Sequence, residues 1–218
     1  MDFRFDIIAE YAWFFFTGTL LTIGLSLAGV FFGTIVGLLI SLGKMAKNRV
    51  ISFFFTCYIT VFRGTPLLVQ LLIIHFGAVP FFLHQSNGVF ATIVALSLNA
   101  AAYIAETIRA GIQSIPRGQM EASRSLGMTH VQAMRYVILP QAIRHILPPL
   151  GNEFISLIKD SSLASTIAAP ELMYWAAAMN AQYYRVWESY LSSAAIYLFL
   201  TFTLSHLLSY IERRLVIR

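Results

Sequence analysis

Residues 117–140 read RGQMEASRSLGMTHVQAMRYVILP, a polar stretch in a chain that is otherwise mostly apolar. Residues 120–126 are good helix formers and predict about two turns of helix. Gly127 follows, where a helix commonly ends in a left-handed residue. Thr129 can cap a second helix, which we expect to end before Pro140. A short helix in a loop between apolar segments has no core of its own to bury, so we expect this loop to dock onto another molecule.

The composition is that of a membrane protein. The chain has 218 residues, of which 58% are hydrophobic and 11% charged, and its mean hydropathy is +0.72. Soluble domains carry about 25% charged residues, and apolar runs of about 20 residues indicate membrane spans. We therefore predict an all-α membrane protein with about five transmembrane helices. A single transmembrane domain should occupy residues 1–218, with its core at about 18–212, and leaves no room for a separate soluble domain.

Five apolar segments supply the expected spans: residues 11–43, 50–77, 89–112, a segment that starts near 143, and 189–211. The second is interrupted by Arg63-Gly64-Thr65-Pro66, and because Pro66 lacks a backbone donor we expect a broken helix there. A turn is expected at 80–88, and an outer segment with a short helix at 164–184.

Small residues recur every four positions in the first span, at Gly29, Gly33, Gly37 and Ser41. Such a stripe allows another helix to approach closely, so we assign these glycines to helix packing.

The distribution of Lys and Arg predicts the orientation. Basic residues gather at 44–49, 117–144 and 213–218. Because cytoplasmic loops carry an excess of positive charge, we place the amino terminus outside and the carboxyl terminus in the cytoplasm. The loop at 117–140 then lies in the cytoplasm between the third and fourth spans. The net charge of +5 fits this bias better than nucleic-acid binding, so no nucleic-acid partner is expected.

The cytoplasmic loop resembles the EAA motif of ABC importer permeases, which reads E-A-A, three residues, G, nine residues, I-x-L-P. Here the corresponding residues are Glu121-Ala122-Ser123, Gly127 and Val137-Ile138-Leu139-Pro140. Ser replaces the last Ala, and Val replaces Ile. In that family the loop forms a coupling helix that sits in a cleft of a separate ATPase subunit. The resemblance implies that the residues coupled to the ATPase are Glu121, Ala122, Ser123, Arg124, Gly127 and Pro140.

Motifs for other chemistry are missing from the sequence. No G-x-x-x-x-G-K-[ST] occurs, so the chain cannot hydrolyse ATP by a P-loop, and its energy source must be a partner. The five His residues are scattered, and we expect no metal site. We therefore expect a transport subunit that is not an enzyme and binds no cofactor, while ATP and Mg are used by a partner ATPase.

The fourth span is unusually polar. On a helical wheel Asp160 lies about 20° from Glu153, and Ser156 lies about 60° from it, so the three share a face. Two acids inside a membrane cost several kcal/mol unless they are paired or wet. In one interpretation Lys159 or Arg63 neutralises them. In the other they face a watery path and contact a polar or charged solute.

The third span carries Asn99, Tyr103, Glu106 and Arg109 near one face. Glu106 and Arg109 are spaced to pair across one turn. Asn99 either makes an interhelical hydrogen bond or lies in a translocation path.

From Gly18 to Arg214 the chain is similar to the membrane subunit of a bacterial ABC importer for polar amino acids, and the blocks FRGTPLLVQ (62–70) and LGNEFISLIKDSSL (150–163) resemble that branch. The resemblance implies a multi-pass protein of the cell membrane. Two permease chains, identical or paralogous, would form the path, with two ATPases below and an extracytoplasmic solute-binding protein that delivers the amino acid. The residues assigned to the substrate path are Arg63, Thr65, Asn99, Glu153, Ser156, Asp160 and Ser161.

Two other classes of function fit the same apolar composition: an ion-coupled secondary carrier or channel that works without an ATPase, and a membrane scaffold. An adjacent gene for a P-loop ATPase, or copurification with one, would separate the importer from both. Because an acid in a watery path favours a cation, the importer interpretation favours a substrate with a cationic or amide side chain.

Overall fold

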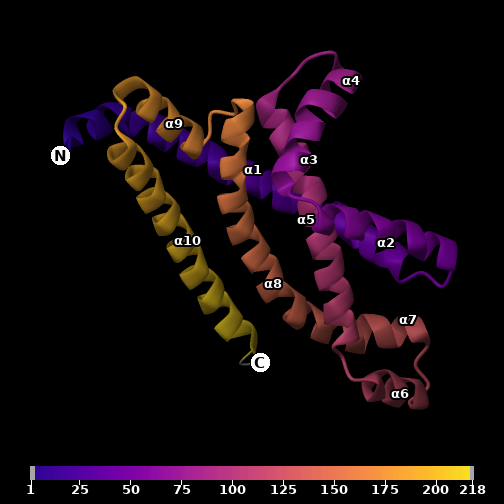
Figure 1. Ribbon diagram of the computed structural model, residues 1–218. Coiled ribbons are helices and arrows are strands. Elements are labelled where there is room, and N and C mark those ends of the chain that lie inside the picture. The colour runs from indigo at the N-terminus through magenta and orange to yellow at the C-terminus, as the bar shows by residue number, and fades with distance from the viewer. Residues whose placement is uncertain (1–2, 217–218) are drawn as a thin grey trace.

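The computed structural model describes residues 3–216 and shows helices joined by short loops (Figure 1), with no strand in that range. Residues 1, 2, 217 and 218 lie outside the described part, including Arg218 of the predicted basic tail. The prediction of an all-α protein is confirmed for the described residues. The helices are α1 (Phe5–Lys44), α2 (Arg49–Gly64), α3 (Leu67–Ile73), η1 (Ile74–Ala78), α4 (Val79–Leu83), α5 (Gly88–Gln113), α6 (Arg117–Ser125), α7 (His130–Ala133), η2 (Met134–Ile138), α8 (Leu139–Asp160), η3 (Ser161–Ile167), α9 (Leu172–Tyr183) and α10 (Val186–Val216).

Three helices are individually long and apolar enough to cross a membrane, namely α1, α5 and α10. The second predicted span is broken at Thr65-Pro66, as the sequence predicts. The helix α2 and the segment Leu67–Leu83 on either side of the break meet at an angle of 107°. The fourth predicted span corresponds to α8, which is less apolar since it holds four charged residues and an internal Pro148-Pro149 pair. The count of five spans and the orientation in the membrane stay predictions.

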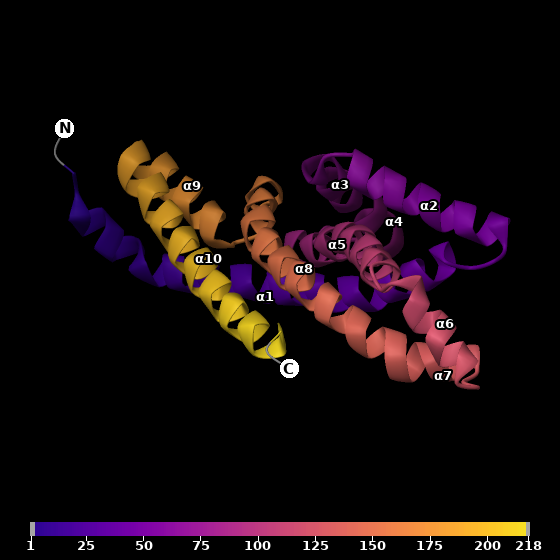
Figure 2. The ribbon, with the colours of Figure 1, turned by 90° about the horizontal axis from the view of Figure 1, so that it is seen from below.

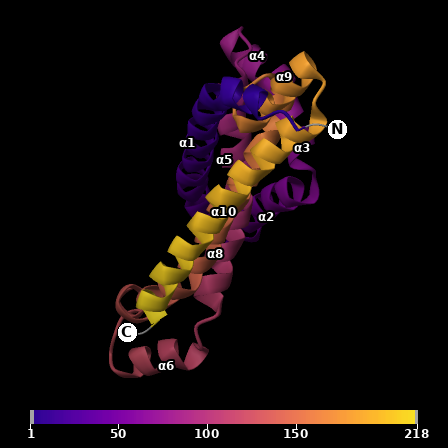
Figure 3. The same cartoon turned by 90° about the vertical axis from the view of Figure 1, so that its left-hand side faces the viewer.

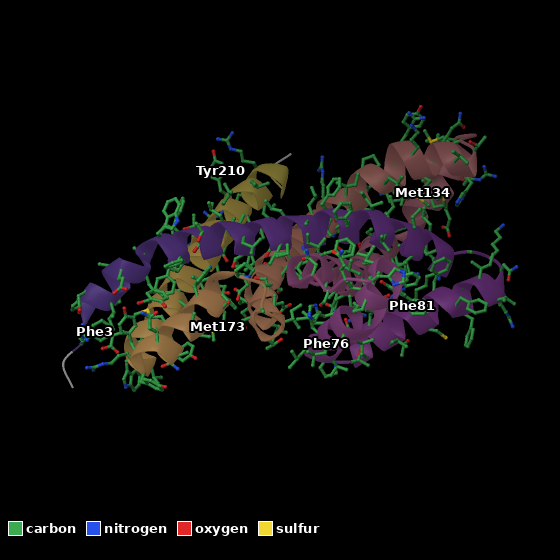
Figure 4. The ribbon with its side chains drawn as sticks, turned by 90° about the horizontal axis from the view of Figure 1, so that it is seen from above. Phe3, Phe76, Phe81, Met134, Met173 and Tyr210 are labelled. Atoms are coloured by element: carbon green, nitrogen blue, oxygen red, sulfur yellow. The ribbon has the colours of Figure 1, made fainter. Side chains whose placement is uncertain are left out.

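The long helix α1 is the base on which the other helices pack. α5, α8 and α10 cross it (Figure 2). Figure 4 places Phe3 and Met173 toward the amino-terminal end of α1, and Phe76 and Phe81 toward the other end. The α9–α10 unit therefore covers one half of α1, while α5 and the bent second span gather on the other half.

The glycine stripe of α1 lies against α5. A Cβ added at Gly33 would come within 2.8 Å of the Ala100 Cβ, and one added at Gly37 within 2.9 Å of the Ala101 carbonyl oxygen. Ala100 and Ala101 are fully buried. Small residues on both helices thus bring the two backbones close together, which is how helices associate in a membrane.

The predicted turn at 80–88 is shorter than expected. The helix continues through Pro80 to Leu83, because the π turn η1 directly before it, in which the Val79 amide donates to the Ile74 carbonyl, accommodates the proline ring. His84 then ends it in a left-handed conformation with φ 54°. Asn87 begins α5 by accepting a hydrogen bond from the Phe90 amide at 2.9 Å.

The prediction that the helix after Thr129 ends before Pro140 is wrong. α7, η2 and α8 form one continuous helix, and Pro140 is the second residue of α8. η2 is a π turn, in which the Leu139 amide donates to the Met134 carbonyl five residues back. This wider turn accommodates the proline ring with a bend rather than a break.

Replacing Gly33 by Val should destabilise the chain by about 1–3 kcal/mol, the usual cost of overpacking, because the added atoms meet Ala100. Thermal unfolding of the purified chain in detergent measures the effect. Gly24→Val is the matched control: it lies in the same helix, and no heavy atom lies within 4 Å of the added Cβ. Equal unfolding temperatures for the two variants would show that the α1–α5 contact does not require glycine.

Candidate functional site

The polar loop stands clear of the helix bundle. α6 and α7 project beyond α5 and α8 at one end of the molecule, the end at which the described part of α10 also finishes (Figures 1 and 3). The loop therefore presents a surface that the rest of the chain leaves uncovered.

Local hydrogen bonds hold the loop in one shape. α6 ends at Ser125, and Gly127 has φ +83°, the left-handed conformation that its position predicts. The Gly127 and Met128 amides donate to the carbonyls of Arg124 and Ser123 at 3.1 and 3.2 Å. Thr129 then begins α7 with a capping box, since its hydroxyl accepts from the Gln132 amide and its own amide donates to the Gln132 side chain.

The residues assigned to coupling are mostly available to a partner. Glu121, Ala122 and Arg124 are exposed, whereas Ser123 is buried and its hydroxyl donates to the Gln119 carbonyl at 2.7 Å. The same surface exposes two apolar side chains, Leu126 (84%) and Val131 (74%). Large exposed apolar groups on a short polar loop are typical of a docking site.

A second candidate site involves α5 and the two helices that pack against it, α2 and α8; its residues Arg63 and Tyr103 are exposed. The Arg63 guanidinium carbon lies 5.1 Å from the centre of the Tyr103 ring, an attractive cation–π arrangement. Glu153 and Asp160 are both half-buried on α8, and their spacing of seven residues keeps them near one face of that helix. The structure thus keeps the two acids together on α8, while Arg63 pairs with Tyr103 across α2 and α5.

These acids form no direct ion pair. Within residues 3–216, Glu153 and Asp160 have no basic side chain at ion-pair distance, and Lys159 is exposed. The hypothesis that Lys159 or Arg63 neutralises them by contact is therefore not supported by the geometry. α8 also runs without interruption through Pro148 and Pro149, so the backbone near Glu153 stays helical.

The remaining predicted path residues differ in exposure. Ser156 is half-buried on α8, whereas Ser161 is fully buried and its hydroxyl donates to the Ile158 carbonyl at 2.8 Å. Thr65 is exposed and its hydroxyl donates to the Val61 carbonyl at 2.8 Å. Asn99 is buried and makes the interhelical hydrogen bond of the alternative interpretation, with Gln70 as acceptor at 2.9 Å.

The predicted Glu106–Arg109 pair is present on α5. The sequence analysis did not foresee its third member, Lys44, whose ammonium lies 2.8 Å from the Glu106 carboxylate. Lys44 is the last residue of α1, so this ion-pair group ties the end of α1 to α5.

Glu171 is a second polar residue that the sequence analysis missed. It is fully buried, it caps α9 by accepting from the amides of Met173 and Tyr174, and it accepts from the Tyr197 hydroxyl of α10 at 2.9 Å. The hydroxyl of Thr22 on α1 is 3.4 Å away. An acidic residue just before a helical segment is a capping signal, but its partners on α1 and α10 are distant in sequence.

No group of three or more His, Cys, Asp or Glu side chains suited to a metal ion occurs among residues 3–216. The two candidate sites are therefore the projecting α6–α7 loop and the polar residues of α2, α5 and α8.

Comparison with known proteins identifies the family. The model of the binding-protein-dependent transport system inner membrane component matches residues 29–217. The L-cystine transport system permease protein TcyB of Bacillus subtilis is 42% identical over 212 residues, which cover 96% of this chain and 90% of that protein. A putative glutamine transport system permease protein GlnP of Rickettsia bellii is 39% identical over 205 residues, 94% of each chain.

Solved structures agree. A crystal structure of an amino acid ABC transporter with histidines matches with a TM-score of 0.92 and 46% identity, over 98% of this chain and 100% of that one. The MetNI methionine ABC transporter in an inward-facing form matches with a TM-score of 0.79 at 22% identity, over 94% of this chain and 98% of that one, which supports the fold. The chain therefore belongs to the family of binding-protein-dependent transport system inner membrane components, the ABC importer permeases, and is a multi-pass protein of the cell membrane.

Proposed function

We propose that this chain is the permease subunit of an ATP-driven importer that carries a polar amino acid, with a cationic or amide side chain favoured. The observation that carries the proposal is the projecting α6–α7 loop, closed by a left-handed Gly127, in a chain 46% identical to an amino acid ABC transporter. Its partners are ATPase subunits, a second permease chain and an extracytoplasmic solute-binding protein. ATP and Mg are used by the ATPase, and this chain binds no cofactor.

The amino terminus lies outside and the α6–α7 loop lies in the cytoplasm. Support comes from charge. Arg117, Arg124 and Arg135 lie in or near the loop, and α10, whose last turns carry Arg213 and Arg214, ends at the same end of the molecule. This arrangement lets a cytoplasmic ATPase reach the exposed Glu121, Leu126 and Val131.

A reporter fusion after the last residue tests the orientation. A fluorescent protein that matures only in the cytoplasm should give signal there, because the basic end of α10 stays inside. A fusion in the 84–87 loop to a phosphatase active only outside the membrane is the complementary probe. Phosphatase activity at the carboxyl-terminal position would refute the orientation.

Coupling to the ATPase depends on the shape of the loop. Gly127→Ala forces a side chain into the left-handed region at about 1–2 kcal/mol, so the docking shape is less populated. We expect stimulation of ATPase activity by loaded binding protein in reconstituted membranes to fall by about fivefold or more.

Gly118→Ala is the matched control for the loop. Gly118 lies in α6 with an ordinary negative φ, and open space surrounds its added Cβ. This variant should keep wild-type stimulation. Wild-type stimulation in the Gly127 variant as well would show that the loop shape does not couple the two subunits.

Glu153 supports the preference for a cationic substrate. At an effective dielectric of ~20, unit charges about 4 Å apart interact by about 4 kcal/mol before desolvation, and a quarter of that gives roughly fivefold preference. Arg63 and Asp160 set the field in which a solute meets this carboxylate. Every amino acid also carries an α-ammonium that Glu153 can hold, so charge on the side chain adds a second attraction.

Glu153→Gln keeps the shape and removes the charge. We expect uptake of labelled arginine into proteoliposomes to fall at least about fivefold relative to glutamine, while complex assembly and basal ATPase activity persist. Glu212→Gln, near the end of α10, is the control for loss of a charge elsewhere. An unchanged ratio of arginine to glutamine uptake would remove Glu153 from the substrate contacts.

A further inference from the structure

The break in the second span exposes backbone carbonyls inside the membrane domain. α2 ends at Gly64 and α3 begins at Leu67, while Thr65 and Pro66 have extended backbone with ψ of 147° and 136°. The last carbonyls of a helix have no partner within it. The residue that would supply a donor to the Phe62 carbonyl in an unbroken helix is Pro66, which has no N–H. Such carbonyls need another donor, because no water is at hand in a bilayer.

The side chain of Gln70 provides that donor. Its Nε2 shares two hydrogens among the Phe62 carbonyl at 2.8 Å, the Thr65 hydroxyl at 2.9 Å and the Thr65 carbonyl at 3.1 Å. Its Oε1 accepts from Asn99 Nδ2 at 2.9 Å. The Phe62 carbonyl also accepts from Asn99 Nδ2 at 3.4 Å. Both amide side chains are only 7% exposed. One side chain thus bridges the two sides of the break and is held in place by α5.

The same stretch of α5 touches the end of α2 at two further points. The Tyr58 hydroxyl donates to the Leu98 carbonyl at 2.7 Å. Tyr103, one turn after Asn99, lies under the Arg63 guanidinium. Arg63 is the last residue but one of α2, close to the break, so the geometry of the break influences where its charge lies relative to the Tyr103 ring.

We infer that Gln70 is a positioning residue of the transport path: its amide, held by Asn99, fixes the bend in the second span and thereby keeps Arg63 over the Tyr103 ring. The inference rests on the proposed function. In this arrangement Asn99 acts on the path indirectly, by holding Gln70. We call the hydrogen-bonded group of Thr65, Gln70 and Asn99 the clamp, because it holds the break at Pro66 in one geometry. No other side-chain chemistry of this length supplies both the donor and the acceptor, because Glu lacks the N–H and Met lacks both.

The test is a double-variant cycle in the assembled complex. Gln70→Met should change the ratio of charged to neutral amino-acid uptake by at least about fivefold, because the loss of the amide that bridges the break lets Arg63 shift. In an Arg63→Gln background the same substitution should have no further effect on that ratio, because the residue that Gln70 positions is gone. Effects that multiply in the double variant, or a wild-type ratio in Gln70→Met, would overturn the inference.

Matched control variants distinguish a shift in the position of Arg63 from a general loss of stability or assembly. Gln141→Met removes a similar side-chain bond, from Nε2 to the Val137 carbonyl at 2.8 Å, away from the break, and should keep the wild-type ratio. If Gln70→Met fails to assemble, Thr65→Val takes its place, since it removes one partner of the amide. Thr60→Val, whose hydroxyl makes an ordinary bond to the Thr56 carbonyl, is its control. A shift for Thr65→Val that vanishes with Arg63→Gln supports the inference, and equal ratios for the two threonine variants overturn it.

Hydrogen exchange makes the inference independent of transport. In Gln70→Met the backbone amides of residues 62–70 should exchange at least about fivefold faster than in wild type, while those of α10 do not change. This holds even if the wild-type complex imports no amino acid, which would refute the proposed function alone. Unchanged exchange across the break would refute the clamp alone.

Discussion

The close approach of α1 and α5 is the contact on which the rest of the structure depends. It is made by glycine on one helix and alanine on the other, at Gly33 and Ala100. Because lipid tails are as apolar as leucine, burial alone gives little drive for helices to associate, and tight packing of small residues must supply it. α5 is the most buried of the three apolar helices. Its other faces contact α2, α8 and the bent segment Leu67–Leu83. The Lys44–Glu106–Arg109 group adds an electrostatic tie at one end of this contact.

Buried polar residues in this protein are of two kinds. Glu171, Gln70 and Glu106 have their hydrogen-bonding or charge requirements met by protein groups. Glu153 and Asp160 lie half-buried and have no such partner among residues 3–216. Satisfied groups hold helices together, whereas an unsatisfied acid in a membrane domain costs energy and marks a place for water, ligand or a further chain. The contrast separates polar residues that hold helices together from acids with no partner among residues 3–216.

Local signals in the sequence predicted local structure well. The left-handed Gly127, the Thr129 cap, the break at Pro66 and the Glu106–Arg109 pair all depend on residues within a few positions of one another. Proline was the weak point, because Pro80 and Pro140 each follow a π turn inside a continuous helix, and this wider turn accommodates the proline ring without ending the helix. Partners distant in sequence were missed. Lys44 meets Glu106, and Gln70 meets Asn99, only after the helices pack. Helical wheels placed Glu153 and Asp160 on one face, but they cannot report the distance to Arg63.

The unbroken course of α7, η2 and α8 has a mechanical consequence. At 1.5 Å per residue, Glu153 lies roughly 36 Å of helix from Thr129, and no extended residue interrupts that length. If the helix ended before Pro140, a flexible non-helical linker would join the loop to the rest of α8. Instead the π turn η2 bends the helix without interrupting it, as seen between α7 and α8 in Figure 1. Because the helix is continuous from the loop to Glu153, we expect a small rotation of the loop to move the Glu153 carboxylate as well.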